Sequence, residues 1–256
     1  MIFDTHAHYD DPAFDGDRDA LLRSFPAAGI GHVTNVCCTL RSLKTTRELT
    51  EAWDFLYGAA GIHPESVGEL SEETFSRVRE TARLPKFVAV GEIGLDYYEK
   101  EAPDRETQKK WFRRQLDLAR ELGKPVVIHS REAAKDTLDI LREARGGEIG
   151  GVIHCFSYSR EMAREYLGLG FFLGIGGVST YKNARRLLEV IRYAPMDRLV
   201  LETDSPYLAP EPHRGTRNSS LNLPLVVRAI AENRGMGAEE VEQQTWENAR
   251  RLYRIS

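Results

Sequence analysis

Cysteine is scarce in this sequence of 256 residues, and long apolar runs and a positive net charge are absent. Cys37, Cys38 and Cys155 are too few and too unevenly spaced for a disulfide framework, and their odd number is typical of a reducing compartment. No apolar run reaches the roughly 20 residues that a membrane-spanning helix needs, and the first residues lack the basic and apolar regions of a secretory signal. We therefore expect a cytoplasmic protein with no membrane partner.

The net charge of −4 excludes a surface that is basic overall, so any phosphate-binding site must be local. A composition of 41% hydrophobic and 29% charged residues is ordinary for a globular protein. The length suits either one large α/β barrel or two smaller domains. Cys37 and Cys38 lie in an apolar run, and we interpret both as small core residues.

Eight short apolar runs are spread along the chain, and a longer amphipathic or polar stretch follows each of them. We predict strands at residues 2–6, 32–38, 57–63, 86–92, 125–129, 151–155, 171–176 and 198–204. Because these runs are almost continuously apolar, they are typical of parallel strands that are covered on both faces.

Helical patterns fill the intervals between the predicted strands. We predict helices near residues 16–28, 43–54, 72–83, 104–122, 132–144, 160–168, 182–193 and 221–233, and a ninth near 238–253. In the clearest pattern, Phe112, Leu116 and Ala119 share one face, and Gly123 follows as a stop. Eight strands that alternate with eight helices predict an α/β fold of the (β/α)8 TIM-barrel type, with a doubly wound open sheet as the alternative.

No linker, low-complexity segment or strong internal repeat divides the chain. We therefore expect a single TIM-barrel domain over residues 1–256, with the extra C-terminal helix packed on its end. Val241, Trp246 and Leu252 are the candidates for the buried face of that helix.

Histidines and carboxylates stand at the carboxyl ends of five predicted strands. They are His6, His8, Glu92, His129, His154 and Asp204. His6 and His8 project to the same side because a strand alternates its faces residue by residue. In a barrel, the carboxyl ends of all strands meet at the face where the βα loops gather. Each residue alone has an ordinary structural explanation, but six such groups packed together without a cation would be poorly matched.

A metal centre resolves this conflict. Six ligands exceed the three protein ligands of a mononuclear catalytic zinc site, so their number favours two divalent ions that share a carboxylate. Glu92 is the natural bridge because its strand is central. Two ions about 3.5–4 Å apart can activate a water and stabilise both oxygens of a phosphodiester cleavage. Mixed imidazole and carboxylate ligands accept Mg²⁺, Mn²⁺ or Zn²⁺, so the identity of the ion stays open.

Several motifs resemble those of one enzyme family. They are DTHAHYD, GEIGLDYY, a helix with Gln108, Phe112, Gln115, Leu116 and Ala119, KPVVIHSREA, HCFS, LETDSPYLAP and a C-terminal NARRLY. Together they resemble the TatD-type metal-dependent deoxyribonucleases over nearly the whole chain. The resemblance implies a TIM barrel, two divalent ions and hydrolysis of DNA, typically stepwise from the 3′ end of single strands.

The resemblance also implies a role for each of the six ligands. It places one ion on His6, His8, Glu92 and Asp204, and the other on Glu92, His129 and His154. Asp204 and Glu92 are the implied catalytic residues, with Asp204 orienting or deprotonating the attacking water. The expected partner is therefore DNA, most simply single-stranded, and we expect the protein to be a monomer.

Residues around the predicted mouth of the barrel are candidates for substrate binding. They are His63, Arg131, Tyr158, Lys182, His213, Arg214 and Arg217. Arginines can contact phosphate oxygens in bidentate geometry, and Tyr158 can stack on a base or narrow the mouth. Asp96 can orient a neighbouring side chain or serve as a turn acid. His32, at the opposite face, is given no role.

Four rim positions depart from the family pattern. Glu65 stands where the family often has a second histidine, and it adds negative charge near the expected phosphate site. Tyr158 replaces a common glycine, and Ser219 and Ser220 replace the usual Glu-Pro after RGTRN. These departures leave open which substrate the rim selects.

Two other classes of function stay open. Amidohydrolase-type barrels also begin with an HxH pair and act on lactones, cyclic amides or organophosphates, but many use a carboxylated lysine where this chain has Glu92. Hydrolysis of a D-aminoacyl-tRNA is a related ester cleavage. A noncatalytic nucleic-acid-binding or scaffold protein has no need of six convergent ligands. The sequence therefore favours a metal-dependent hydrolase, with deoxyribonuclease activity as the leading hypothesis.

Overall fold

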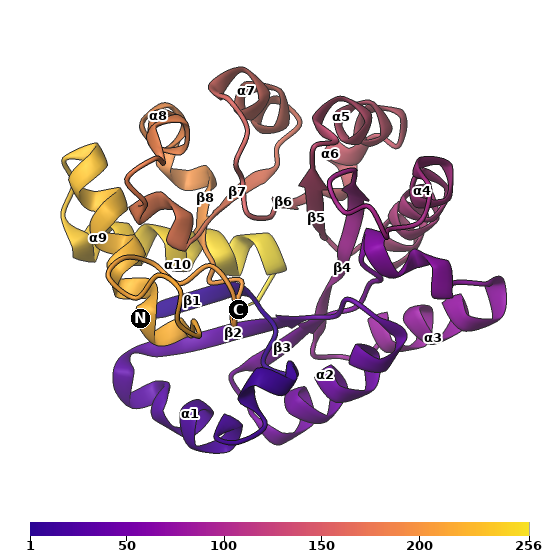
Figure 1. Ribbon diagram of the computed structural model, residues 1–256, viewed down its shortest axis with the longest axis horizontal. Coiled ribbons are helices and arrows are strands. Elements are labelled where there is room, and N and C mark those ends of the chain that lie inside the picture. Colours follow the sequence, from indigo (N-terminus) through magenta and orange to yellow (C-terminus); the bar gives the residue numbers. More distant parts are fainter. Residues whose placement is uncertain (256) are drawn as a thin grey trace.

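A computed structural model describes residues 1–255, in which eight parallel strands form a barrel ringed by helices (Figure 1). The strands are β1 (Ile2–Ala7), β2 (Ile30–Val36), β3 (Leu56–Ala59), β4 (Phe87–Asp96), β5 (Val126–Arg131), β6 (Gly151–Ile153), β7 (Phe172–Ile175) and β8 (Leu199–Leu201). Neighbouring strands pair in the order β1 to β8, and every pair is parallel. The predicted (β/α)8 TIM barrel is confirmed.

Helices connect the strands on the outside of the barrel. The α-helices are α1 (Arg18–Ser24), α2 (Leu40–Ala52), α3 (Glu72–Ala82), α4 (Arg105–Leu122), α5 (Ala134–Glu143), α6 (Gly146–Ile149), α7 (Arg160–Gly168), α8 (Arg185–Tyr193), α9 (Leu223–Arg234) and α10 (Ala238–Tyr253). The 3₁₀ helices are η1 (Pro12–Phe14), η2 (Pro26–Ala28), η3 (Pro64–Glu69), η4 (Gly177–Thr180), η5 (Met196–Arg198) and η6 (Ser220–Asn222). Within the described residues, no helix is both long and apolar enough to cross a membrane.

Every predicted strand ends at a different residue in the structure, and two of these shifts, in β3 and β4, bear on the site. The strand predicted to reach residue 63 ends at Ala59, because His63 already caps η3 and accepts a hydrogen bond from the N–H of Glu65. The strand predicted to end at residue 92 continues to Asp96, because its last residues pair with β5. Glu92 therefore lies inside β4 and not at its end.

Local capping explains the shifts in the helices. The helix predicted from residue 43 begins at Leu40, because Thr39 and Ser42 form a capping box. The helix predicted over residues 16–28 is divided into α1 and η2, and Pro26 stands at the start of η2. The short α6 was not predicted.

The predicted buried faces are confirmed. Phe112, Leu116 and Ala119 of α4 are fully buried, and Gly123 ends that helix in the left-handed region with φ 62°. In α10, Val241 and Leu252 are buried, and the partly buried Trp246 stacks on His32 with ring centroids 4.9 Å apart. His32 thus belongs to an aromatic cluster near the start of β2, at the end of the barrel away from the predicted ligands.

The barrel closes through contacts between β1 and the segment after β8. Ala7 forms a parallel bridge with Ser205. The N–H groups of Thr203 and Asp204 both donate to the carbonyl of His6, at 3.3 and 2.9 Å. This closure places Asp204 directly beside the strand that carries the two N-terminal histidines.

Asp4 stabilises the same closure from inside the barrel. Its side chain is fully buried, and Oδ1 accepts a hydrogen bond from the N–H of Thr203 at 3.0 Å. Oδ2 accepts from the hydroxyls of Thr203 and Ser220, at 2.7 and 2.6 Å. Asp4 therefore fixes the position of the segment that carries Asp204.

We predict that Asp4→Ala lowers the free energy of unfolding by about 3 kcal/mol, because the buried donors of Thr203 and Ser220 lose their acceptor. Urea unfolding followed by circular dichroism measures the change. The matched control is Asp117→Ala on the exposed face of α4, which should change stability by less than about 0.5 kcal/mol. Equal stability of the two variants would contradict the structural role of Asp4.

Candidate metal centre

The structure brings the six predicted ligands together at the mouth of the barrel. They are His6 in β1, His8 directly after it, Glu92 in β4, His129 in β5, His154 after β6 and Asp204 after β8. The side chains are buried or half-buried, so each polar atom depends on its neighbours for a partner.

The two oxygens of Glu92 face two different groups of histidines. Oε2 lies 3.2 Å from His6 Nε2 and 3.9 Å from His8 Nε2. Oε1 lies 3.0 Å from His129 Nδ1 and 3.9 Å from His154 Nε2. Glu92 thus occupies the position between the groups that a shared carboxylate needs.

Asp204 completes the cluster on the side away from β4. Its Oδ1 lies 3.3 Å from His8 Nε2, 3.7 Å from His6 Nε2 and 3.5 Å from His154 Nε2. The residue has φ 58°, in the left-handed region that non-glycine residues rarely adopt. Such strained backbone clusters at functional sites, where surrounding contacts hold it in place.

The second ring nitrogen of two histidines is held by an acceptor outside the cluster. His8 Nδ1 lies 2.9 Å from the carbonyl of Val36, and His129 Nε2 lies 2.8 Å from Asp96 Oδ2. Such contacts fix the tautomer and the ring orientation of a metal-binding histidine. In both residues, the other nitrogen is left to face the centre.

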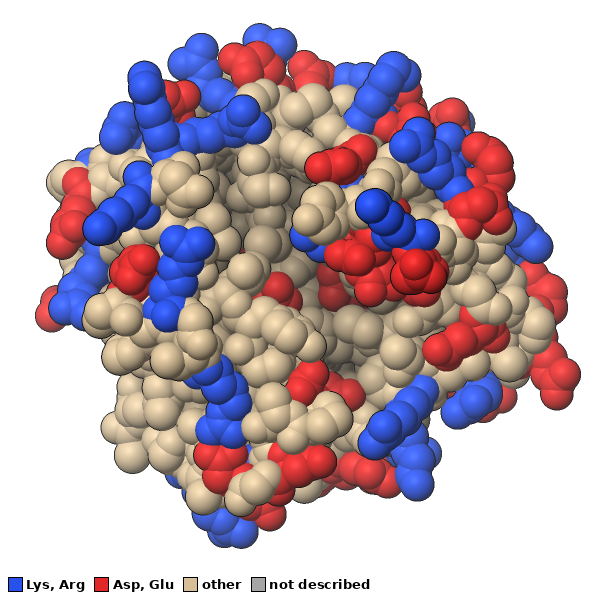
Figure 2. All heavy atoms as spheres, in the orientation of Figure 1, with Lys and Arg blue, Asp and Glu red and all other residues tan. Residues whose placement is uncertain are grey.

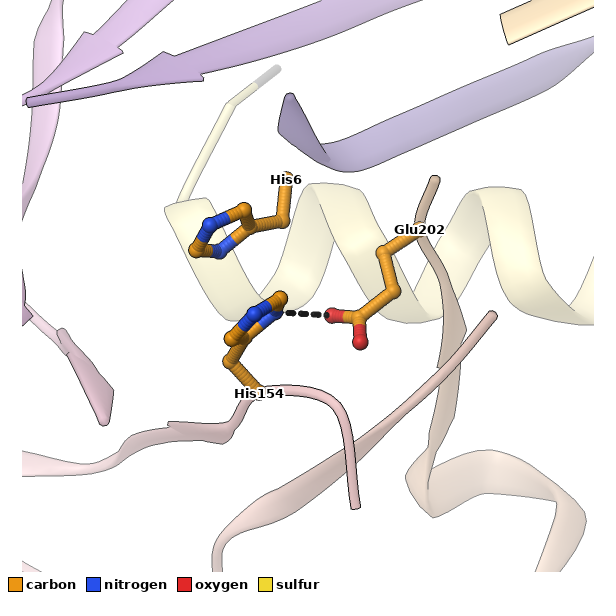
Figure 3. A group of neighbouring side chains, drawn as sticks. All are labelled: His6, His154 and Glu202. Carbon is orange, nitrogen blue, oxygen red and sulfur yellow. Dashed lines mark ion pairs between the residues drawn. The ribbon is translucent and has the colours of Figure 1, made fainter. Parts of the chain in front are cut away.

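Glu202 forms an ion pair with the outer nitrogen of His154, and it was not among the predicted site residues. It is 1% exposed, with Oε2 3.1 Å from His154 Nδ1 (Figure 3) and Oε1 accepting a hydrogen bond from the N–H of Cys155. The ring of His154 stacks on that of His6 with centroids 3.5 Å apart (Figure 3). The sequence feature that could have identified Glu202 is its place in the motif LETD, two residues before Asp204.

Burial and ion pairing act in opposite directions on the carboxylate between the histidines. Burial raises the pKa of Glu92, but its interactions with the surrounding histidines, among them His6, His63 and His129, together hold this pKa well below its usual range. Burial lowers the pKa of His6 itself. A charged Glu92 therefore faces a neutral His6, and the neutral imidazole is the form that binds a cation.

The other three histidines of the set hold protons more tightly, and contacts with Cys38 and Asp204 raise the pKa of His8 well above its usual value against the effect of burial. Burial opposes their charge, but hydrogen bonds to Asp96 and Glu92 raise the pKa of His129 to about 9. The negative charge of Glu202 and its neighbours likewise raises the pKa of His154 to about 9, against the effect of burial. In the metal-free protein, protons on these rings supply the positive charge that a cation would bring.

The donor set fits a divalent cation. His6 Nε2 and His8 Nε2 lie only 3.1 Å apart, which leaves two imidazole nitrogens facing each other beside a carboxylate. Two groups of three side chains, one with His6 and His8 and one with His63 and His129, each offer ligand atoms within 4.8 Å of one another, and both include Glu92. Imidazole nitrogen and carboxylate oxygen together suit zinc and manganese.

His63 was predicted as a substrate-binding residue around the mouth, but it lies deeper, next to the metal centre. Its Nε2 is 3.7 Å from Glu92 Oε1, and its Nδ1 accepts a hydrogen bond from the N–H of Glu65 at 3.3 Å. Burial and the neighbouring His129 lower its pKa to about 3, so the ring is neutral. With Nδ1 as the acceptor, the proton resides on Nε2, which points into the mouth as a donor.

Arg131 and Tyr158 stand on one side of the mouth and have partners within the protein. The guanidinium of Arg131 stacks on the ring of Tyr98 at 3.8 Å and pairs with Glu99 at 3.3 Å. The hydroxyl of Tyr158 lies 2.9 Å from Ser130 Oγ, so the ring joins the turn after β6 to β5. Their contact with substrate stays a prediction.

The remaining rim candidates lie on exposed loops. Lys182 follows β7, and His213 and Arg214 follow β8. Arg217 is different, because its two terminal nitrogens both lie 2.6 Å from the carboxylate of Asp17. This ion pair ties the loop after β8 to the start of α1, which is a structural contact.

The prediction for Cys38 was wrong. Cys37 is a buried core residue, as predicted, but β2 already ends at Val36 and Cys38 lies half-buried on the following turn. Its Sγ is 3.7 Å from Glu92 Oε2 and 3.8 Å from His8 Nδ1. Burial raises the pKa of this thiol to about 12, so it borders the centre in its protonated form.

Comparison with known proteins agrees with this geometry. The family described as TatD related DNase matches residues 3–254. A Bacillus subtilis protein named as the uncharacterized metal-dependent hydrolase YabD is 39% identical over 100% of both chains. An Erwinia tasmaniensis protein named 3′-5′ ssDNA/RNA exonuclease TatD is 35% identical over 99% of this chain and 100% of its own.

A solved structure shows the same architecture. YjjV, a TatD homologue from Escherichia coli, superposes with a TM-score of 0.93 and is 32% identical, covering 100% of this chain and 98% of its own.

We predict that metal binding releases protons. At pH 7 His8, His129 and His154 are protonated in the metal-free protein, because the pKa of His8 is raised well above its usual value and those of His129 and His154 are about 9, whereas a cation binds only the neutral imidazole. The apparent affinity for Mn²⁺ or Zn²⁺ should therefore rise as the pH increases towards about 9. Titration calorimetry at pH 7 in two buffers of different ionisation enthalpy should show release of about three protons per chain, one from each of these histidines.

The matched control for this measurement is Glu202→Gln, which removes the negative charge that holds the proton on His154. This variant should release fewer protons than the wild type. An affinity that does not change with pH, with no proton release in either protein, would contradict the account.

Proposed function

Because the chain belongs to the TatD related DNase family of metal-dependent hydrolases, we propose that it is an exonuclease that removes nucleotides from the 3′ end of single-stranded DNA. The position of Glu92 between two groups of histidines is the single observation that carries this proposal. A relative named as a 3′-5′ ssDNA/RNA exonuclease supports both the substrate class and the direction, and it extends the proposal to RNA.

The proposed centre would hold two divalent ions, Mg²⁺, Mn²⁺ or Zn²⁺, with Glu92 as a ligand common to both. His6, His8 and Asp204 would hold one ion, and His129 and His154 would hold the other. When bound, ions of this kind lower the pKa of a water and offset the negative charge of the phosphodiester.

Asp204 is the residue that would take the proton from the attacking water. Burial raises the pKa of Asp204, but the neighbouring His154 and the other histidines bring it below its usual value, so the carboxylate is ionised and able to accept a proton. Its Oδ1 is shared among three histidine nitrogens, which fixes the carboxylate at the mouth.

His63 would bind a phosphate oxygen. The ring is neutral and its Nε2–H points towards the centre, so it can donate a hydrogen bond without repelling a cation. Glu65 carries its negative charge on the chain segment next to this donor, but its backbone N–H is what sets the tautomer of His63.

The charge distribution around the mouth supports a polyanionic substrate. A groove of about 780 Å³ lies between the turns after β6 and β7, and its walls include Arg160, Arg185 and Arg186 together with Glu161 and Glu189. Lys and Arg side chains gather over α7 and α8, whereas Asp and Glu side chains gather on the opposite side of the hollow, beside the end of β4 (Figure 2). This asymmetry favours approach of a phosphate backbone from the α7–α8 side.

We predict that the purified protein, supplied with Mn²⁺ or Mg²⁺, shortens single-stranded DNA from its 3′ end. A 3′ label should be released at once as a mononucleotide, whereas a 5′ label should remain on a ladder of shorter strands. Asp204→Asn should lower kcat about 1,000-fold, because the base that accepts the proton is lost.

The control variant Asp197→Asn changes an exposed acid in η5 and should keep full activity. Unfolding temperatures should be similar for both variants and the wild type. Full activity of Asp204→Asn, or activity that survives a chelator, would contradict the proposed mechanism.

A further inference from the structure

A pocket of about 250 Å³ opens beside His8, next to the proposed metal centre. Its walls come from the turn after β1, the turn after β2 and the segment after β8. Asp10, Asp11 and Tyr207 are among the lining residues, and none of them was predicted to contact substrate.

We propose that this pocket binds the base of the terminal nucleotide that the enzyme removes, with the ring of Tyr207 as its stacking platform. This inference rests on the proposed exonuclease function and adds to it a site for the end of the strand. It is supported by the size of the pocket, the setting of the tyrosine and the charge of the walls.

The size of the pocket suits one ring system. Pockets for drug-sized ligands measure about 300–1,000 Å³, so a pocket of about 250 Å³ is too small for several nucleotides. Because His8 belongs both to the pocket and to the metal centre, a base held here lies within one nucleotide of the cleavage position.

Tyr207 is fixed in position while its ring stays accessible. Its hydroxyl donates a hydrogen bond to Asp11 Oδ2 at 3.0 Å, and the residue is 56% exposed. An anchored aromatic ring of this kind loses little conformational freedom when a base stacks on it. Stacking of this type accepts any base, as a nuclease without sequence preference requires.

The walls of the pocket disfavour a phosphate. Asp10 is held by the side chains of Asn35 and Thr45, each at 2.9 Å, and Asp11 is held by Tyr207. These two carboxylates outnumber Arg41, which is the one Lys or Arg side chain in the described lining. An uncharged base, whose edge carries N–H donors, therefore suits the pocket better than the charged backbone, which we expect on the α7–α8 side.

A second exposed tyrosine at the mouth provides a matched control. Tyr98 is 52% exposed, close to the value for Tyr207, but the guanidinium of Arg131 already covers its ring at 3.8 Å. Tyr98 lies outside the pocket, and its ring face is occupied. Removing its ring should therefore leave recognition of the terminal base unchanged.

The test compares two single-stranded oligonucleotides that differ only in the terminal nucleotide, which either carries its base or is abasic. In the wild type, loss of the base should lower kcat/KM about 10-fold. Tyr207→Phe keeps the ring and should show the same 10-fold loss. Tyr207→Ala should cleave both oligonucleotides at similar rates, because the stacking ring is gone. Tyr98→Ala should keep the 10-fold loss that the wild type shows for the abasic end.

Binding of the same two oligonucleotides to the chelator-treated protein, which does not cleave them, can be followed by fluorescence anisotropy. The wild type, Tyr207→Phe and Tyr98→Ala should bind the abasic end more weakly, and Tyr207→Ala should bind both ends equally. An equal loss for the abasic end in the wild type and in Tyr207→Ala would overturn the inference while leaving the exonuclease proposal intact. Failure of the metal-loaded wild type to cleave either oligonucleotide would overturn both.

Discussion

A buried negative charge between two groups of imidazoles is the constraint on which the rest of the site depends. Glu92 is almost fully buried inside β4, and a carboxylate in that position needs positive charge on both sides. In the metal-free protein, protonated His8 supplies that charge beside Oε2, and protonated His129 and His154 supply it beside Oε1. Divalent ions would supply it in the active enzyme. The same two oxygens that are paired with histidines are thus those a pair of ions would share.

The fold positions the ligands of this centre in two ways. The contacts that close the barrel between β1 and the segment after β8, with Asp4 among them, bring the first histidines beside Asp204 across about 200 residues of sequence. Closer to the centre, the carbonyl of Val36 and the carboxylate of Asp96 hold histidine rings by their outer nitrogens. Orientation of the ligands is therefore a property of the surrounding structure and not of the ligands alone.

The sequence predicted those parts of the site that follow from strand periodicity. His6 and His8 were placed on one side because strands alternate, and His129, His154 and Asp204 because parallel strands end at one face of a barrel. Glu202 and Cys38 were not found, because their contacts depend on where β8 and β2 end, and such boundaries are set by tertiary pairing. The ion pair of Arg217 with Asp17 could not be predicted from the sequence either, because it joins two segments far apart in the chain.

The most direct test of the account is the metal content of the protein. After dialysis against Mn²⁺ or Zn²⁺ and removal of free ions, elemental mass spectrometry on the wild type and on Glu92→Gln gives the number of ions per chain. The account predicts about two ions in the wild type and fewer than about one in the variant, because both proposed sites share this carboxylate. A single ion per chain that is unaffected by the substitution would contradict it.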